Sequence, residues 1–188
     1  MKNFMTNCSL FAVALLAGPA LAQDVPASEL SLAYSYVNAN APPDHCDCFS
    51  MNGASSSYAY NFSSAFAVVA DVGVEHSGNV RSSGLDLTLT SFLVGARYSY
   101  RNLSKIAVFG EVLAGGVHAS GGLAAIATSS NSASTDFAAL AGAGVDVTIN
   151  PHLAVRALEL DYFWTTLPNG VNGYQGNLRA SVGLVFRF

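Results

Sequence analysis

Apolar and polar residues alternate along most of the chain, and the last twelve residues show this pattern most clearly. From Asn177 to Phe188 the even positions carry Leu, Ala, Val, Leu, Phe and Phe, while the odd positions are mostly polar or small. A repeat of two residues is typical of a β-strand whose two faces meet different surroundings. The C-terminal segment is therefore predicted to be a strand with an apolar, partly aromatic face.

Seven further segments of the chain show the same alternation. These predicted strands span residues 29–38, about 55–62, 65–76, about 87–101, 105–118, 136–149 and 153–164. Short connections follow the second, fourth and sixth strands, and long connections follow the others, including the Gly-, Ser-, Ala- and Asn-rich residues 119–134. An even number of strands with alternating short and long connections predicts an up-and-down antiparallel barrel.

Charged side chains of these strands gather on the face opposite to the aromatic residues. They are Asp71, Glu75, Arg97, Glu111, Asp146, Glu159, Asp161 and Arg179. A water-soluble barrel would place its apolar face inside, so the inverted pattern favours a barrel whose outside contacts lipid. The predicted fold is all-β: an eight-stranded antiparallel transmembrane β-barrel with short periplasmic turns and long external loops. Arg156 breaks the alternation, which predicts either a β-bulge near Ala157 or an arginine that reaches the periplasmic rim.

The inward charges have two interpretations. They could line an ion path, or they could be a paired and hydrated filling. Eight strands enclose a space just wide enough for side chains, which favours the filling and excludes a large solute pore.

The N-terminus has the three parts of an export signal. Lys2 gives a basic start, residues 10–17 are apolar, and Ala20, Leu21 and Ala22 form a small-x-small cleavage site. We expect residues 1–22 to be a signal peptide and residues 23–188 to be a single barrel domain. Cys8 lies before the apolar core, so it is not expected to be a lipoprotein cysteine.

Composition fits this picture and excludes one class of partner. Hydrophobic residues make up 51% of the chain, charged residues 11%, and the formal net charge is −4. The charged fraction is well below that of ordinary soluble domains. No basic patch is present, so nucleic acid is not an expected partner.

A cluster of potential metal donors lies in the first long connection. Asp44, His45, Cys46, Asp47 and Cys48 follow one another there. Structural zinc usually needs wider ligand spacing from more than one segment, so no metal site is expected. Cys46 and Cys48 are the only cysteines after the signal, and an oxidising compartment favours a short disulfide between them.

The chain resembles the small eight-stranded outer-membrane barrels of the OmpA-like and OmpX-like family. Residues 159–164 (Glu-Leu-Asp-Tyr-Phe-Trp) are similar to the penultimate strand of that family, and the chain ends on Phe188 as its members do. The resemblance implies location in the outer membrane, contact with its lipids, and a terminal Phe188 that is read by the barrel assembly machinery. It also implies a monomer without cofactors. The peptidoglycan-binding domain of full-length OmpA-type proteins is not expected.

One enzymatic alternative rests on His118, Ser120 and Asp136. Outer-membrane lipid A deacylases resemble this arrangement, with a His-x-Ser pair and a nearby acid on the lipid-facing surface. There the histidine activates the serine and the acid orients the imidazole. This chain departs from that motif at Gly121 and has Asp136 where the family uses Glu. The plainer interpretation is an interfacial histidine and a loop serine.

The sequence therefore predicts a non-enzymatic outer-membrane β-barrel that contributes to envelope integrity or surface interaction. The alternative is a lipid A-modifying acyl hydrolase that uses His118, Ser120 and Asp136.

Overall fold

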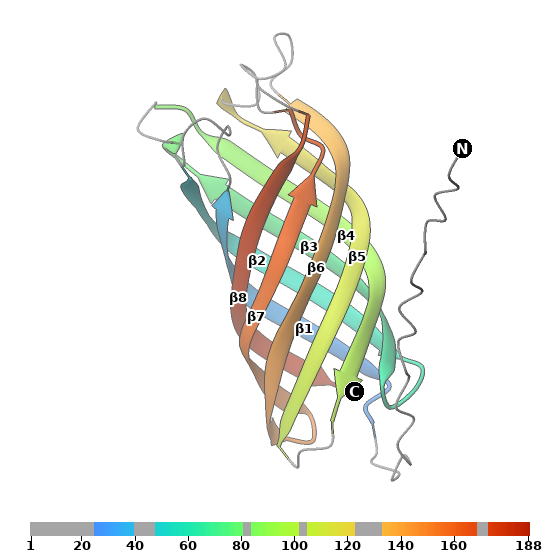
Figure 1. Cartoon of the computed structure of the whole chain (residues 1–188). Coiled ribbons are helices and arrows are strands. Elements are labelled where there is room, and N and C mark those ends of the chain that lie inside the picture. The colour runs from blue at the N-terminus through green and yellow to red at the C-terminus, as the bar shows by residue number, and fades with distance from the viewer. Residues whose placement is uncertain (1–24, 40–47, 81–83, 102–104, 123–132, 169–172) are drawn as a thin grey trace, which may run out of the picture.

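Eight antiparallel strands close into one barrel (Figure 1). The computed structural model describes residues 25–39, 48–80, 84–101, 105–122, 133–168 and 173–188. The strands are β1 (Ser28–Ala39), β2 (Phe49–Asn61), β3 (Phe66–Ser77), β4 (Leu87–Tyr100), β5 (Ile106–Ser120), β6 (Ala133–Asn150), β7 (Leu153–Thr165) and β8 (Gln175–Arg187). Each strand pairs with the next, and β8 pairs with β1. The predicted strand number, order and antiparallel arrangement are confirmed.

The predicted strand bounds are wrong by more than two residues in two places. β2 begins at Phe49 and not near Ser55, because residues 50–57 are mostly Ser, Asn, Ala and Gly. Such residues hide the alternation, since small polar side chains occupy both faces. β6 begins at Ala133 and not at Asp136, and β5 continues to Ser120. The connection between these two strands is therefore shorter than the sequence predicted.

The two ends of the barrel differ, and we name them by their connections. The turn end carries the short connections at residues 62–65, 101–105 and 151–152. The start of β1 and the end of β8 also lie there. The loop end carries the longer connections and lies at the top of Figure 1. No helix in the described part of the chain is long and apolar enough to cross a membrane.

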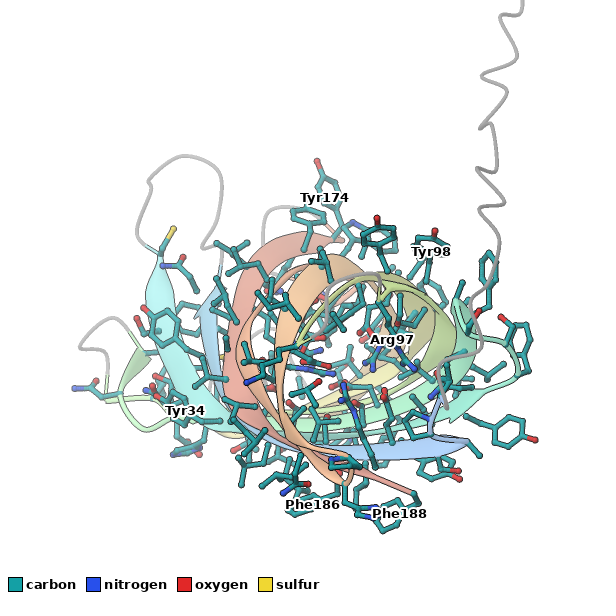
Figure 2. All side chains as sticks on the ribbon, turned by 90° about the horizontal axis from the view of Figure 1, so that it is seen from below. Tyr34, Arg97, Tyr98, Tyr174, Phe186 and Phe188 are labelled. Carbon is teal, nitrogen blue, oxygen red and sulfur yellow. The ribbon has the colours of Figure 1, made fainter. Side chains whose placement is uncertain are left out.

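Aromatic and aliphatic side chains point away from the barrel axis along its whole circumference. Figure 2 shows Tyr34, Tyr98 and Phe188 outside the ring of strands and Arg97 inside it. Exposed aromatic residues lie near both ends of the strands: Tyr58, Tyr60, Phe62, Phe66, Tyr98, Tyr100 and Phe188 at the turn end, and Tyr34, Phe92, Phe137 and Tyr162 toward the loop end. Two aromatic girdles around an apolar band are the expected outer surface of a membrane barrel.

The first and last strands close the barrel through backbone hydrogen bonds. The N–H of Phe188 donates to the carbonyl of Ser28 at 2.9 Å, and the N–H of Ser28 donates to the carbonyl of Phe188 at 3.3 Å. Closure gives a partner to backbone groups that a lipid environment would leave unsatisfied.

Apolar side chains fill much of the lumen toward the loop end. Val37 and Ala39 end β1, Leu87 and Leu89 begin β4, and Val117 and Ala119 end β5. The same buried cluster reaches nearer the turn end with Ala59, Ala67 and Val69. We call its members toward the loop end the apolar plug: Val37, Ala39, Met51, Val80, Leu87, Leu89, Leu93, Leu113, Val117, Ala119, Ala138, Leu140, Phe163 and Leu167. Dispersion contacts and exclusion of water stabilise this part of the interior.

Candidate functional site

A first group of lumen charges lies at the turn end. Glu29 Oε1 accepts a hydrogen bond from Arg101 Nη2 at 3.2 Å, and it lies 3.2 Å from Arg187 Nε in an ion pair. Burial lowers the pKa of Arg101, which lies just beyond β4, while the Glu29 carboxylate opposes that shift. The sequence analysis missed these three residues. Their positions at the very ends of strands made their facing hard to assign.

A second group lies one layer further into the lumen, around an aromatic ring. Arg97 Nη2 lies 2.7 Å from Glu111 Oε2. Arg156 donates from Nε to Asp146 Oδ1 at 3.0 Å and from Nη1 to Glu159 Oε2 at 3.2 Å. These contacts fix two guanidinium groups in a buried environment, where charge-assisted hydrogen bonds are strong.

The ring of Phe109 lies against both guanidinium groups of this second group. The Cζ atoms of Arg97 and Arg156 lie 4.4 Å and 4.5 Å from the ring centroid. Both distances are within the range of cation–π attraction. Gly144 provides the necessary space, because a Cβ atom at this position would collide with the Phe109 ring. The sequence analysis did not foresee this arrangement, since Phe109 is apolar and faces the charged side.

A β-bulge in β7 turns Arg156 into the lumen. The register of β7 against β8 shifts between Arg156 and Glu159, and its register against β6 shifts beside Asp146. The bulge predicted near Ala157 is therefore confirmed, and the alternative of an arginine at the rim is wrong, because Arg156 is only 1% exposed. Without the bulge, Arg156 and Glu159 would face opposite sides of the sheet.

A third group lies toward the middle of the barrel. Arg179 donates from Nη1 to Asp71 Oδ1 at 3.0 Å and from Nε to Asp161 Oδ2 at 2.9 Å. These contacts join β8 to β3 across the lumen as well as to the adjacent β7. Glu75 has a different partner, because it accepts a hydrogen bond from the Ser35 hydroxyl at 2.8 Å.

The structure places all eight charges of the sequence analysis inside the barrel, and it adds Glu29, Arg101, Arg156 and Arg187 to them. Seven of the eight take part in ion pairs with an arginine or a carboxylate, and Glu75 has its hydrogen bond to Ser35. The set can therefore act as a cross-strand filling that holds the strands around the lumen.

Three of these carboxylates lie close enough together to be considered as a cation site. Potential ligand atoms of Glu111, Glu159 and Asp161 lie within 4.8 Å of one another, and all three residues are buried. Each of the three already contacts an arginine. Their ion pairs with arginine therefore account for their arrangement.

The three residues of the enzymatic alternative lie near the loop end but on two faces of the sheet. His118 and Ser120 are on the outward side of β5, and the Nδ1 atom of His118 lies 2.7 Å from the Thr135 hydroxyl. Asp136 follows the inward parity of Ala138 and Leu140, and it accepts a hydrogen bond from the Ser134 hydroxyl at 2.5 Å. The strand pairing sets Asp136 beside Val117, so the carboxylate does not orient the His118 imidazole.

The connection between β3 and β4 is held to the end of β5 by one carboxylate. The backbone N–H of Gly122 donates to Asp86 Oδ1 at 2.9 Å and lowers the pKa of this aspartate. Gly121 has a φ of 114°, a conformation that glycine adopts readily, and a Cβ atom there would collide with Asp86.

Two predicted features lie wholly or partly outside the described residues. Residues 1–22, the predicted signal peptide, are not described, and neither are Asp44, His45 and Cys46. Cys48 is exposed just before β2. The disulfide between Cys46 and Cys48 therefore stays a prediction.

Several solved structures of outer-membrane proteins share this fold. Neisserial surface protein A (NspA) is 15% identical, covers 86% of this chain and 97% of its own, and superposes with a TM-score of 0.66. Ail of Yersinia pestis is 16% identical, with coverage of 87% and 99% and a TM-score of 0.58. OprG of Pseudomonas aeruginosa is 12% identical, with coverage of 87% and 97% and a TM-score of 0.52. At these identities the likeness shows the fold.

Sequence comparison extends this result to the family. No curated protein matches the chain. The family model described as "Outer membrane protein beta-barrel domain" matches residues 8–188. With nearly the whole sequence matched and a closed eight-stranded barrel as its structure, the chain belongs to the outer membrane protein beta-barrel domain family.

Proposed function

We propose that this outer-membrane barrel is a non-enzymatic structural protein that contributes to envelope integrity. The observation that carries the proposal is the filled lumen. Ion pairs occupy it from the turn end to the middle, and the apolar plug occupies it toward the loop end. A barrel filled in this way offers lipid a stable outer surface and offers solutes no open path.

The orientation follows from the family. In outer-membrane barrels the short turns are periplasmic and the longer loops are extracellular. The turn end of this barrel is accordingly assigned to the periplasm and the loop end to the cell surface. Phe188 then lies at the periplasmic rim, where 70% of its surface is exposed and available to the barrel assembly machinery before the strand is embedded.

Reconstitution in planar bilayers tests the filled lumen directly. The folded protein is expected to give no stable ion conductance, because buried Leu93, Leu113 and Leu140 close the path beyond the ion pairs. As a matched pair, Leu113→Gly should open the plug more than Ala114→Gly, since Ala114 faces outward. Steady single-channel conductance of the unmodified barrel would contradict a purely structural lumen.

Deletion of the gene tests the envelope role. The deletion strain is expected to become sensitive to detergent and to recover when the unmodified protein is supplied. Complementation with Ser120→Ala should succeed equally well, because a structural barrel does not need that hydroxyl. A deletion strain with normal detergent resistance but reduced attachment to host cells or surfaces would instead place the protein among surface-interaction proteins. Ail, the attachment invasion locus protein of Yersinia pestis, shares the fold and is by its name of that second kind.

The hydrolase alternative has its own test. It requires His118 to activate Ser120, and the facing of Asp136 argues against a triad. Lipid A extracted from the deletion strain, the wild type and a Ser120→Ala strain should give the same mass spectrum. An acyl chain that is lost only when Ser120 is intact would establish the enzyme and overturn the structural proposal.

Location, processing and assembly can be measured on one preparation. An unheated outer-membrane sample should migrate differently from a boiled one, because closed barrels stay folded in cold detergent. Intact mass should correspond to a monomer that begins at Gln23, after cleavage behind Ala22. Replacement of Phe188 by Ser should reduce the folded fraction in cells, whereas the same change at Phe62, another exposed aromatic residue at the turn end, should have less effect.

A further inference from the structure

A row of polar side chains runs across four neighbouring strands, β3 to β6, on the outward face of the barrel near the loop end. The strand pairing sets His76 beside Thr88, Thr88 beside Ser120, Thr90 beside His118, and His118 beside Thr135. All of these residues share the outward parity of their strands. We call His76, Thr88, Thr90, His118, Ser120 and Thr135 the rim belt. It continues the exposed polar side chains of Ser50 and Asn52 on β2, next to β3, and it lies above the apolar part of the outer surface.

The two histidines of the rim belt are held in the same way. His76 Nδ1 lies 2.9 Å from the Thr88 hydroxyl, and His118 Nδ1 lies 2.7 Å from the Thr135 hydroxyl. In each case the partner is a threonine on the next strand. Both rings are exposed, so the engaged Nδ1 atom fixes the ring and leaves Nε2 for a partner outside the protein.

The residues just below the belt fix its depth in the membrane. Two positions toward the turn end from His76, Thr90 and Thr135 lie Val74, Phe92 and Phe137, which are 46%, 59% and 50% exposed. Aromatic side chains of membrane proteins gather at the boundary between hydrocarbon and headgroups. The rim belt therefore lies at the level of the lipid headgroups of the outer leaflet.

Within the part of the chain that the structure describes, few residues can supply positive charge at this level. In the described ranges every arginine lies in or at the mouth of the lumen, and Lys105 is at the turn end. His76 and His118 are thus the groups of the rim belt that can become positive. His76 faces Asn52 of β2 and Thr88 of β4, with Asp86 nearby in the following connection. His118 faces Thr90 of β4 and Thr135 of β6, which are uncharged.

We propose that the rim belt binds the phosphate of an outer-leaflet lipid headgroup, with His76 and His118 as the donors that select it. Hydroxyl groups of the belt would donate further hydrogen bonds to the phosphate oxygens. Imidazole becomes cationic as the pH falls below neutrality, and hydrogen bonds from a cation to phosphate are stronger than those from a neutral donor. Binding therefore tightens in acid. This goes beyond the proposed envelope role, since a structural barrel need not select any headgroup.

The test compares three histidines of the same folded barrel. His152 is the control, because it is exposed at the turn end and its Nδ1 also has a hydrogen-bond partner, the carbonyl of Arg187. The mature protein, His76→Gln/His118→Gln and His152→Gln are refolded in neutral detergent, and heat-dependent migration verifies the closed barrel in each. Native mass spectrometry then gives the apparent Kd for the first bound lipid A. The titration is run at pH 5.5 and pH 8, with bisphosphorylated lipid A and with the same lipid after removal of its phosphates.

The unmodified protein and His152→Gln are expected to bind bisphosphorylated lipid A roughly tenfold more tightly at pH 5.5 than at pH 8, which corresponds to one added charge-assisted hydrogen bond. The double variant should lose this pH dependence, and dephosphorylated lipid A should never show it. Three results would overturn the proposal: equal affinity at both pH values, an equal loss in His152→Gln, or the same pH dependence without phosphate. A failed detergent-sensitivity test would refute the envelope role and leave this result unaffected.

Discussion

The two halves of the lumen are filled by different means. Toward the periplasm, Arg97, Arg101, Arg156 and Arg187 hold carboxylates from several strands. Toward the cell surface the apolar plug predominates, and the buried Glu75 there accepts a hydrogen bond from a serine hydroxyl. The charged half depends on complete pairs, because a buried ion without its partner is costly. The apolar half depends on volume, because a missing side chain leaves a cavity. The two halves should therefore respond differently to single substitutions.

The largest effect is expected from Arg156→Met. It leaves Asp146 and Glu159 buried without their shared cation, and we expect a loss of about 3–5 kcal/mol in the free energy of unfolding. Urea titration in lipid vesicles, read by the heat-dependent gel shift, measures it. The triple variant Arg156→Met, Asp146→Asn, Glu159→Gln should recover most of the loss. If the single variant is as stable as the parent, the charged half is not held by its pairs.

A core truncation in the other half should cost slightly less. Leu140→Ala is expected to lower the free energy of unfolding by about 2–5 kcal/mol, since its side chain is only 1% exposed. The exposed Leu160→Ala, which faces lipid, is the matched control. The loss in free energy of unfolding at Leu140 should be the same at pH 5 and pH 8. The loss in a variant that lacks one partner of an ion pair should differ between these two pH values. A strongly pH-dependent deficit at Leu140 would erase the distinction between the halves.

Phe109 is an apolar side chain within the charged half, and its replacement should have a smaller effect than either of these changes. Phe109→Leu keeps an apolar side chain but removes the ring that contacts Arg97 and Arg156, for an expected loss of about 1–2 kcal/mol. Phe92→Leu, on the lipid-facing side, should change stability less. A double-mutant cycle with Arg97→Met isolates the ring–cation contribution, and a coupling energy near zero would mean that Phe109 acts by volume alone.

The smallest effect is expected at the loop end, where the Gly122 N–H donates a hydrogen bond to Asp86 Oδ1. The lowered pKa of Asp86 means that its contribution is present above the ordinary carboxyl range and is lost as the pH falls through the lower, folded value. Hydrogen exchange at the Gly122 amide should therefore keep its protection at pH 5 and lose it in stronger acid. Asp86→Asn should remove this pH dependence. If the protection of the Gly122 amide does not change as the pH is lowered, other contacts hold this connection to β5.

The sequence was sufficient for the fold because a two-sided environment imposes a strict alternation. Leu178, Val182 and Leu184 could be assigned to the lipid face from parity alone, and the structure leaves each of them exposed. Alternation fails where side chains are small, which is why the start of β2 was missed. It fails again at Arg156, where the break in parity revealed a bulge but not the partners that the bulge creates.

The contents of the lumen were only partly predictable. Parity identified which charges point inward, but pairing across the lumen depends on the stagger of the strands around the barrel. Arg179 meets Asp71, a residue 108 positions away on a strand that is not its neighbour. The contact of the Phe109 ring with two arginines likewise depends on three strands at once. The rim belt needed the register too, because His76 and His118 come together with their threonines only after β3 to β6 are aligned.

The closure between Ser28 and Phe188 has a consequence for chain connectivity. Because the two ends of the barrel segment meet through paired backbone hydrogen bonds at one rim, a short linker could join them without disturbing any strand. The chain could then be opened at the turn between β2 and β3, giving a circular permutant in which β3 is first and β2 is last. The register and the lumen of this permutant would be unchanged, and its C-terminal strand would end at Tyr60, Asn61 and Phe62. Such a molecule would separate what the terminal aromatic residue does for assembly from what the sequence of β8 does for the finished barrel.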